Sequence, residues 1–232
     1  MRGFRRNVAA IGVLAEPVRR ELYLFVCSQT EPVTRDQAAK AMGIAHHQAK
    51  FHLDRLEAEG LLATDYVRLT GRSGPGAGRP SKRYRRGGTE IAITLPERQY
   101  EVAGRLMAEA ITASARTGTS VTDTLNMAAG AHGAAIAAEA TDRPTSAQDA
   151  LDLAVNLLAA QAYEPRQTGP TVVMINCPFQ ALARSHTKLV CGMNHSILAG
   201  FVQAAAPNLL AARLNPEENR CCVTLVALGA AD

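Results

Sequence analysis

The sequence lacks the segments that send a chain across or into a membrane. Its opening residues, MRGFRRNVAAIGVLAEP, are basic, but their apolar part is too short for a secretory signal and helix signals follow at once. No apolar run is long enough to span a bilayer. The five cysteines are odd in number, which argues against a secreted disulfide framework. We therefore expect a cytoplasmic chain with no membrane partner, and its 232 residues allow two modest domains.

The sequence also lacks any C-x-x-C pair, the spacing that presents two zinc ligands from one turn. Four of the five cysteines nevertheless fall in the C-terminal part: Cys177, Cys191, Cys221 and Cys222. Thiolates gathered together select zinc, copper(I) or an iron–sulfur cluster. Widely spaced single cysteines fit a cluster held between different elements of a folded domain better than a zinc turn.

The elements that carry these cysteines can be read from the sequence. The run TVVMINCPF predicts a strand that ends at Cys177, where Pro178 stops it. A single helical stretch, QALARSHTKLVCGMNHSILAGFVQAA, carries Cys191. A second strand pair, LLAARL and RCCVTLVAL, closes the domain. Neighbouring residues of a strand point to opposite faces, so we expect only one of Cys221 and Cys222 to face the site, with a slight preference for Cys221.

Acidic residues are missing from the segment Arg68–Arg86, which contains seven Lys and Arg residues. It follows a stretch that predicts two helices and a turn. Thr34 and Gln37 fit a capping box, Gly43 suits the turn, and a second helix is expected from about Ala45 to Glu59. Strands at Leu61–Leu69 and Lys82–Arg86 would enclose a Gly/Pro-rich tip, Arg72–Ser81. This order predicts a winged helix-turn-helix that lies across duplex DNA.

The candidate DNA-binding residues come from the outward face of the second helix and from the basic wing. Gln and Arg read base edges and Lys pairs with phosphates, and each phosphate contact steepens the salt dependence of binding. We predict this set to be His46, His47, Gln48, Lys50, His52, Arg55, Arg68, Arg72, Arg79, Lys82 and Arg83.

The rest of the chain predicts an α+β architecture. A helix opened by Pro96 carries an apolar stripe, and we interpret this stripe as a dimer seam rather than as intrachain core. Its members are Tyr100, Ala103, Leu106, Met107, Ala110 and Ile111. Helices at Ser120–Ala140 and after Ser146 precede the cysteine-bearing strands. We therefore expect a DNA-binding domain over residues 1–90, a linking and dimerisation helix over 91–118, and a sensor domain over 119–232.

Three runs resemble the winged-helix domain of ArsR-type bacterial repressors: AEPVRRELYLFV, HHQAKFHLDRLEAEGLL and GRPSKRYR. The likeness covers roughly the first 90 residues. It is strongest to the subgroup that carries a larger C-terminal sensor domain. The resemblance implies a homodimer that binds double-stranded operator DNA.

The pattern NCPF…SHTKLVCGMN…CCVTL resembles the C-terminal domain of the SufR-like regulators within that group. This resemblance implies a repressor with an iron–sulfur cluster, 4Fe-4S, that senses redox, nitric oxide or iron status. Its implied ligands are Cys177, Cys191 and either Cys221 or Cys222. The fourth position would be filled by His186, by the second vicinal cysteine or by an outside ligand. This chain departs from the family pattern in its doubled last cysteine.

Two alternatives to the cluster stay open. The same DNA-binding dimer could take zinc or a small organic ligand as its effector. A thiol enzyme would use Cys191 as nucleophile with His186 or His195 as base, but no oxyanion or acidic partner pattern accompanies them. We therefore expect a protein that is not an enzyme.

Overall fold

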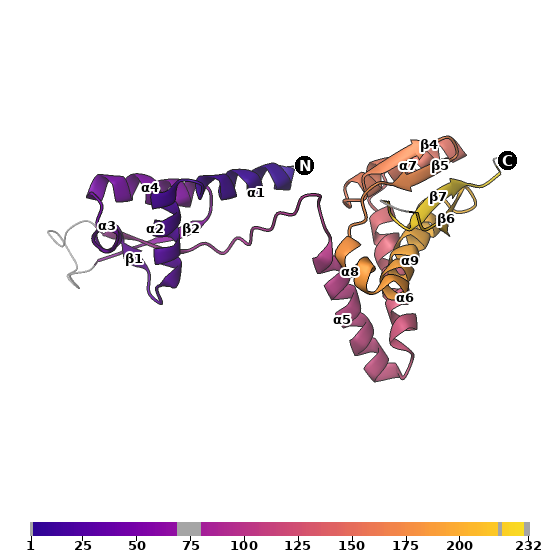
Figure 1. Ribbon diagram of the computed structural model, residues 1–232, viewed down its shortest axis with the longest axis horizontal. Helices are drawn as coiled ribbons and strands as arrows, with labels where there is room; N and C mark the ends of the chain where they lie inside the picture. The colour runs from indigo at the N-terminus through magenta and orange to yellow at the C-terminus, as the bar shows by residue number, and fades with distance from the viewer. Residues whose placement is uncertain (1, 69–79, 218–219, 230–232) are drawn as a thin grey trace. The chain divides into compact units, whose positions relative to one another are not determined.

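The computed structural model describes residues 2–68, 80–217 and 220–229, and the chain divides into two compact units (Figure 1). The first unit is Met1–Ile93 and the second is Thr94–Asp232. Each unit combines helices with an antiparallel sheet around its own hydrophobic core, which confirms the predicted α+β class. Within the described ranges, no helix combines the length and apolarity that crossing a membrane requires.

The N-terminal unit packs its helices against a small sheet with the strand order β1-β3-β2. Its core includes the fully buried side chains of Leu22, Leu53, Leu56 and Tyr84. The predicted helix, turn, second helix and two wing strands are all present. In chain order the elements are α1 (Arg2–Val13), α2 (Pro17–Ser28), β1 (Val33–Thr34), α3 (Arg35–Met42), α4 (His46–Ala58), β2 (Leu62–Val67) and β3 (Ser81–Arg86).

Local sequence explains where the helices of this unit begin and turn. The backbone N–H of Gln37 donates to Thr34 Oγ1 at 3.2 Å, and Gln37 Oε1 accepts from the Thr34 N–H at 2.7 Å, so the predicted capping box is formed. Gly43 ends α3 with a φ of 63°, a conformation in which a Cβ atom would be strained. The turn therefore delivers α4 at a fixed angle to α3.

The C-terminal unit contains a four-stranded antiparallel sheet with the order β4-β5-β7-β6, and α7 and α9 pack against it. In chain order its elements are α5 (Tyr100–Thr117), α6 (Val121–Ala137), α7 (Ala147–Ala159), β4 (Pro165–Thr168), β5 (Thr171–Met174), α8 (Gln180–Ser185), α9 (Thr187–Ala205), β6 (Leu210–Leu214) and β7 (Val223–Ala227).

Glycines allow α6 and α9 to cross closely within this unit. A Cβ atom at Gly133 would lie 1.8 Å from the carbonyl oxygen of Ile197, and one at Gly200 would lie 2.1 Å from that of Gly130. No side chain fits at such distances. The α6–α9 pair is therefore tightly packed, and Cys191 lies on α9, one of its two helices.

The helix α5 differs from its prediction in its start and in its role. It begins at Tyr100 rather than Pro96, because Arg98 and the Gln99 N–H bind the loop after β5 instead of continuing a helix. Ala103, Leu106 and Ala110 are fully buried in the core of their own unit. For these three residues the interpretation as a dimer seam is therefore wrong, and they are intrachain core. Tyr100 and Ile111 of the same predicted stripe are exposed.

Three further predictions about the C-terminal unit need correction. The strand β5 ends at Met174, so Cys177 lies on the following loop and not on a strand. The single predicted helix is two helices, α8 and α9, which meet at His186. The edge strand β4 was not predicted, because its Arg and Gln side chains are exposed and its segment contains prolines and glycine.

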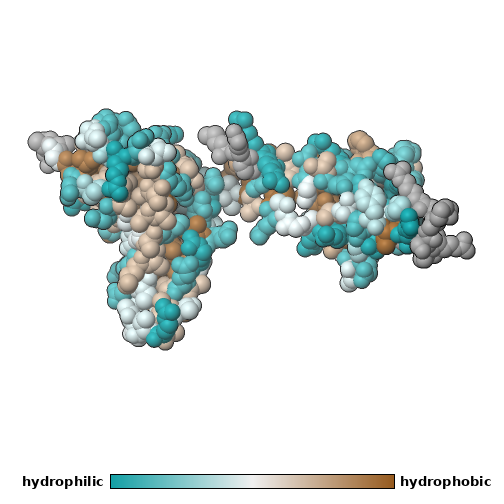
Figure 2. Space-filling view, turned by 180° about the vertical axis from the view of Figure 1, so that it is seen from behind, coloured by the Kyte–Doolittle hydropathy of each residue, from teal (hydrophilic) through white to brown (hydrophobic). Residues whose placement is uncertain are grey.

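Apolar side chains remain on the surface of α5 and α6. Ile111 is 59% exposed, Val121 44% and Met127 71%. Figure 2 shows pale and light brown residues over the lobe where α5 ends and α6 begins, whereas the visible face of the N-terminal unit is mainly hydrophilic. Ile111 is a member of the predicted stripe, whereas Val121 and Met127 lie on α6.

Candidate functional site

The outward face of α4 carries most of the predicted DNA-reading residues. Five of them are exposed: His46, His47, Gln48, Lys50 and Arg55. The inward face is held by Ala49, Leu53 and Leu56, which are fully buried. In helix-turn-helix proteins the N-terminal residues of the second helix meet the base edges. The structure therefore places a mixed polar and basic surface where such a helix reads DNA.

Several of these side chains already have partners within the N-terminal unit. Lys50 Nζ lies 2.8 Å from Asp54 Oδ2, and Arg55 Nη2 lies 2.9 Å from Glu59 Oε1, both as i,i+4 pairs. Exposed pairs of this kind are weak and are readily exchanged for phosphate contacts. Gln48 Oε1 accepts a hydrogen bond from the Ala45 N–H at 3.3 Å. Its side-chain nitrogen makes no hydrogen bond to the described part of the chain, so it can donate to a base edge.

His52 does not face outward as predicted. Its side chain is only 14% exposed, and its Nδ1 lies 3.4 Å from Glu16 Oε2. Glu16 also accepts hydrogen bonds from the first backbone N–H groups of α2. Position 52 lies three residues after Ala49 and four before Leu56, so helical phase turns it toward the buried side. His52 therefore faces the start of α2 instead of the DNA-reading surface, and its Nδ1 makes no hydrogen bond to the described residues.

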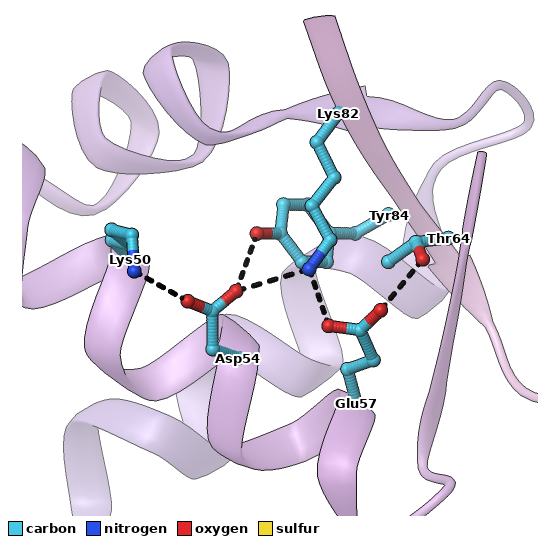
Figure 3. Close-up of polar contacts among 6 residues, drawn as sticks. All are labelled: Lys50, Asp54, Glu57, Thr64, Lys82 and Tyr84. Carbon is cyan, nitrogen blue, oxygen red and sulfur yellow. Dashed lines mark hydrogen bonds and ion pairs between the residues drawn. The ribbon is translucent and has the colours of Figure 1, made fainter. Parts of the chain in front are cut away.

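Lys82 on the wing is also turned inward, into a set of polar contacts that we call the wing network (Figure 3). Its ammonium group contacts Glu57 and lies 3.2 Å from Asp54 Oδ1. The hydroxyl of Tyr84 donates to the same Asp54 oxygen at 3.0 Å. The members of the network are Lys50, Asp54, Glu57, Thr64, Lys82 and Tyr84.

The wing network fixes the wing to α4 and sets the charge of Asp54. Burial alone would raise the pKa of Asp54, but hydrogen bonds from Lys50, Lys82 and Tyr84 outweigh it and hold this pKa below its usual value. Burial and the hydrogen bond to Asp54 raise the pKa of Tyr84 to about 12. Asp54 is thus ionised and forms ion pairs at neutral pH. Lys82 was predicted to bind DNA, but its charge is neutralised by Asp54 and Glu57 within the fold.

The other basic residues of the wing divide into two groups. Arg83 forms a bidentate pair with Asp65, with both nitrogen–oxygen distances at 2.9 Å, so it is also not a free phosphate contact. Arg68 is exposed at the end of β2. The predicted contacts Arg72 and Arg79 lie outside the described residues. Of the described wing residues in the predicted set, Arg68 is therefore the one available to a phosphate.

A cavity of about 660 Å³ in the C-terminal unit gathers three of the predicted thiols, and we call it the cysteine cavity. Cys177 reaches it from the loop between β5 and α8, Cys191 from α9 and Cys222 from the segment before β7. Cys221 is only 1% exposed and lies behind this wall. Polar and charged residues also line the cavity: Glu164, Asn176, Gln180, Arg184, Thr187, Glu217 and Arg220.

The cysteine thiols lie close enough to shift one another's pKa values. The neighbouring Cys221 thiol and then burial raise the pKa of Cys177. Cys177 lowers the pKa of Cys221, but Cys222 and burial outweigh it and raise this pKa to about 11. Burial raises the pKa of Cys191, while Cys222 opposes that shift. Of the vicinal pair, Cys222 lines the cavity and Cys221 is buried behind it, so one of the two faces the site as expected, but it is Cys222 and not the preferred Cys221. Strand alternation does not cause this difference, because neither residue lies on a strand.

A chain of buried polar groups supports Cys221. Asn194 Nδ2 donates to the sulfur of Cys221 at 3.0 Å. The hydroxyl of Tyr163 donates to Asn194 Oδ1 at 2.6 Å, which fixes the orientation of the amide. Both side chains are at most 2% exposed. Sequence reasoning missed this pair, although a polar Asn three residues after Cys191 in an apolar helix was a usable signal.

His186 is not brought to the thiols. It is exposed at the break between α8 and α9 and does not line the cysteine cavity. The proposal of His186 as a fourth ligand is therefore not supported by its position. Among residues 2–68, 80–217 and 220–229, no three His, Cys, Asp or Glu side chains already form a group able to hold a metal ion.

The comparison with known protein families concerns the N-terminal unit. Residues 14–65 match the family model described as a helix-turn-helix domain. No curated protein and no solved structure matches the chain. The match covers α2, α3, α4 and much of β2, which are the elements that carry the reading face. It supports a DNA-binding transcriptional regulator with a helix-turn-helix domain.

Proposed function

We propose that this chain is a dimeric transcriptional repressor whose binding to operator DNA is governed by an iron–sulfur cluster held at the cysteine cavity. The observation that carries the sensing part is the convergence of three thiols, Cys177, Cys191 and Cys222, from three separate segments on one cavity. The helix-turn-helix match carries the DNA-binding part. The repressor role and the cluster themselves rest on the resemblance to SufR-like regulators.

DNA recognition would use the exposed face of α4 together with Arg68. Gln48 would donate to a base edge, while Lys50, Arg55 and Arg68 would meet phosphates. Proteins of this architecture bind paired half-sites as twofold dimers, with reading helices about 34 Å apart. A second copy of the chain is therefore the expected partner, and the exposed apolar residues of α5 and α6 offer it a surface.

The residues at the cysteine cavity fit an iron–sulfur cluster by their donor chemistry. Thiolates are the usual protein ligands of such clusters. Cys177, Cys191 and Cys222 line the cavity, and Cys221 is buried next to Cys222 in the chain. Cys221 is buried, whereas Cys177, Cys191 and Cys222 are partly exposed where they line the cavity. We assign the ligand role to Cys177, Cys191 and one of Cys221 and Cys222, with the second vicinal thiol available for the fourth position.

A cluster bound there would supply an iron centre that oxidants, nitric oxide or iron shortage can remove. Three segments would respond to its loss through their own residues. Cys177 lies on the loop after β5, Cys191 on α9, and Cys221 and Cys222 before β7. When the thiols no longer bind the cluster, these three segments lose the bonds that connect them to one another. The C-terminal unit then no longer holds the reading helices at the spacing of the operator half-sites.

Zinc and a small organic ligand remain the competing effectors. Zinc would use the same thiols, because Cys is also its preferred ligand. An organic ligand would use the volume of the cavity and its mixed lining, which includes Arg184 and Arg220. Either effector would leave the DNA-binding half of the proposal intact. The metal and sulfide content of the protein separates the three.

The test is purification under anaerobic conditions, followed by measurement of iron, acid-labile sulfide, zinc and the visible spectrum. The proposal predicts a coloured protein with iron and sulfide in equal amounts, and loss of both in Cys177→Ser and Cys191→Ser. Cys27→Ser, in the N-terminal unit, is the matched control and should keep its colour. Colourless protein with bound zinc, or with neither metal nor sulfide, would contradict cluster sensing.

A further inference from the structure

The segment that enters the C-terminal unit is tied to the loop that carries Cys177. Residues 175–179, which we call the Cys177 loop, join β5 to α8. The Gln99 N–H donates to the carbonyl oxygen of Pro178 at 3.1 Å. The side chain of Asn176 donates to the carbonyl oxygen of Glu97 at 3.0 Å. Residues 97 and 99 thus hold the Cys177 loop from both sides of Arg98.

Arg98 is the centre of this connection. Its Nη1 donates to Asn176 Oδ1 at 2.7 Å and to the carbonyl oxygen of Cys177 at 2.6 Å. Its Nη2 donates to Gln180 Oε1 at 2.7 Å. A guanidinium group is planar and presents its donors in a rigid fork, so it can satisfy three acceptors only while they keep their positions. A shift of the Cys177 backbone therefore breaks the bonds of Arg98.

The loop side of this connection is also anchored. Asn176 is only 6% exposed, and its amide donates a second bond to the carbonyl oxygen of Ala162 at 2.7 Å. Asn176 thus accepts from Arg98 and donates to two carbonyl groups, which uses its whole amide. Small displacements of the Cys177 loop are for this reason passed to residues 97–99 instead of being absorbed by a loose side chain.

The residues that precede Arg98 connect the second compact unit to the DNA-reading unit along the chain. The first compact unit ends at Ile93 and the second begins at Thr94. The backbone N–H of Arg98 donates to Thr94 Oγ1 at 2.9 Å, so the conformation of Arg98 also fixes the residue at which the chain enters the second unit. Four residues separate the boundary from Arg98.

We propose that Arg98 is a positioning residue that couples the state of Cys177 to the segment Thr94–Gln99, and through it to DNA binding. This inference rests on the proposed function, because it names how the occupancy of the cysteine cavity reaches the reading helices. Arg98 does not bind the cluster. Its side chain binds the Cys177 carbonyl oxygen, and its backbone N–H binds Thr94, so a shift of the carbonyl group moves the segment Thr94–Gln99.

The experiment measures coupling rather than activity alone. A duplex is first selected from a random-sequence library with the anaerobically purified full-length protein. Affinity for this duplex is then measured for cluster-bound and cluster-free protein, and the ratio of the two is the coupling. Coupling between sites commonly amounts to roughly 5- to 150-fold. Iron content and the visible spectrum are recorded for every variant.

Arg98→Gln should retain the iron and the spectrum of the wild type while its affinity ratio falls toward one. Arg98→Lys, which keeps the charge but not the fork, should recover little of the ratio. Gln180→Leu removes a single acceptor and should lower the ratio partly. Arg184→Gln is the matched control, since Arg184 is exposed and lines the same cavity, and it should keep the full ratio.

Each contrary result has a distinct meaning. A wild-type ratio in Arg98→Gln would overturn the role of Arg98 and leave the proposed function standing. Loss of the cluster from Arg98→Gln would overturn it also, because Arg98 would then be a support of the ligand loop. A ratio of one in the wild-type protein would overturn the proposed function and this inference together.

Discussion

At the scale of single residues, Asn194 supports the innermost thiol of the cysteine cluster. It donates to the sulfur of Cys221 and accepts from Tyr163, and all three side chains are almost completely buried. A buried polar group that loses its partner costs about 1 to 3 kcal/mol. Replacing Asn194 by an apolar residue removes the partner of two groups at once. Its effect should therefore exceed that of an ordinary hydrogen bond.

We predict that Asn194→Leu lowers the free energy of unfolding of the cluster-free protein by about 1 to 3 kcal/mol, measured by urea denaturation. Ser196→Ala is the matched control on the same helix, because its hydroxyl makes a single partly buried bond to Asn126. It should cost about 1 kcal/mol or less. Equal losses in the two variants would show that the Tyr163–Asn194–Cys221 chain contributes nothing special.

Lys82 and Arg68 are both basic residues of the wing, but the structure gives them different tasks. Lys82→Met removes the cation of Glu57 and one of the two cations of Asp54, so it should lower the free energy of unfolding by about 1 to 2 kcal/mol. It should leave the salt dependence of DNA binding unchanged. Arg68→Ala should leave the free energy of unfolding unchanged. It should make the slope of the logarithm of the DNA-binding constant against the logarithm of salt concentration shallower by about 0.9. A shallower slope in Lys82→Met would show that Lys82 binds phosphate after all.

Asp54 gives the wing network a pH dependence of known sign. Its pKa in the folded protein lies below the ordinary value of 3.8. The stability that it contributes is therefore complete above that value and is lost as the pH falls through the lower, folded value. We predict that the stability gap between wild type and Asp54→Asn is constant near neutral pH and shrinks below about pH 4, in thermal unfolding of the full chain. Asp142→Asn, on an exposed loop, should follow the wild-type profile. A stability difference between wild type and Asp54→Asn that grows as the pH falls would show that the pKa of Asp54 is not lowered by folding.

At the scale of elements, the close crossing of α6 and α9 holds the C-terminal unit together. Gly133 and Gly200 lie at the contact, where any side chain would meet backbone atoms. We predict that Gly133→Ala lowers the free energy of unfolding by at least about 1 to 3 kcal/mol, although alanine favours helices. Gly104→Ala on α5, where nothing lies within 4 Å, should instead raise stability by about 0.5 to 1 kcal/mol. Similar changes at the two glycines, followed by circular dichroism, would contradict the close crossing.

The elements also show what could be predicted from the sequence. The capping box at Thr34, the turn at Gly43 and the end of α4 are local signals, and the structure contains all of them. The inward position of Lys82 could have been predicted as well, because it lies two residues before the buried Tyr84 and strand side chains alternate. The same alternation could not help with Cys221 and Cys222, since they precede β7 instead of lying on it.

Other features depend on contacts that are distant in sequence. The strand β5 ends at Met174 because Asn176 is taken up by Glu97 and Ala162, which no local pattern shows. Pro96 is a good first residue for a helix, yet Arg98 and Gln99 bind the Cys177 loop and delay α5 to Tyr100. The predicted dimer seam is wrong for Ala103, Leu106 and Ala110 for a related reason. An apolar stripe has the same periodicity whether its partner is α6 or a second chain.

At the scale of the whole molecule, the chain consists of two units with separate cores, and the boundary falls at Ile93 and Thr94. The first unit carries the helix-turn-helix match and the exposed reading face. The second carries the cysteine cavity, and its entering segment is bonded to the loop of Cys177. This arrangement puts a thiol site next to the point at which the second unit receives the chain, which is where a signal to the DNA-binding half would have to start.

The most direct test of cluster-governed DNA binding is a paired measurement on one anaerobic preparation. Iron and sulfide are determined per chain, and the affinity for a duplex selected from a random library is measured before and after removal of the iron. The account predicts about four irons and four sulfides for a 4Fe-4S cluster, and a marked loss of affinity when they are removed. Iron-free, colourless protein that binds the same duplex with unchanged affinity would contradict it.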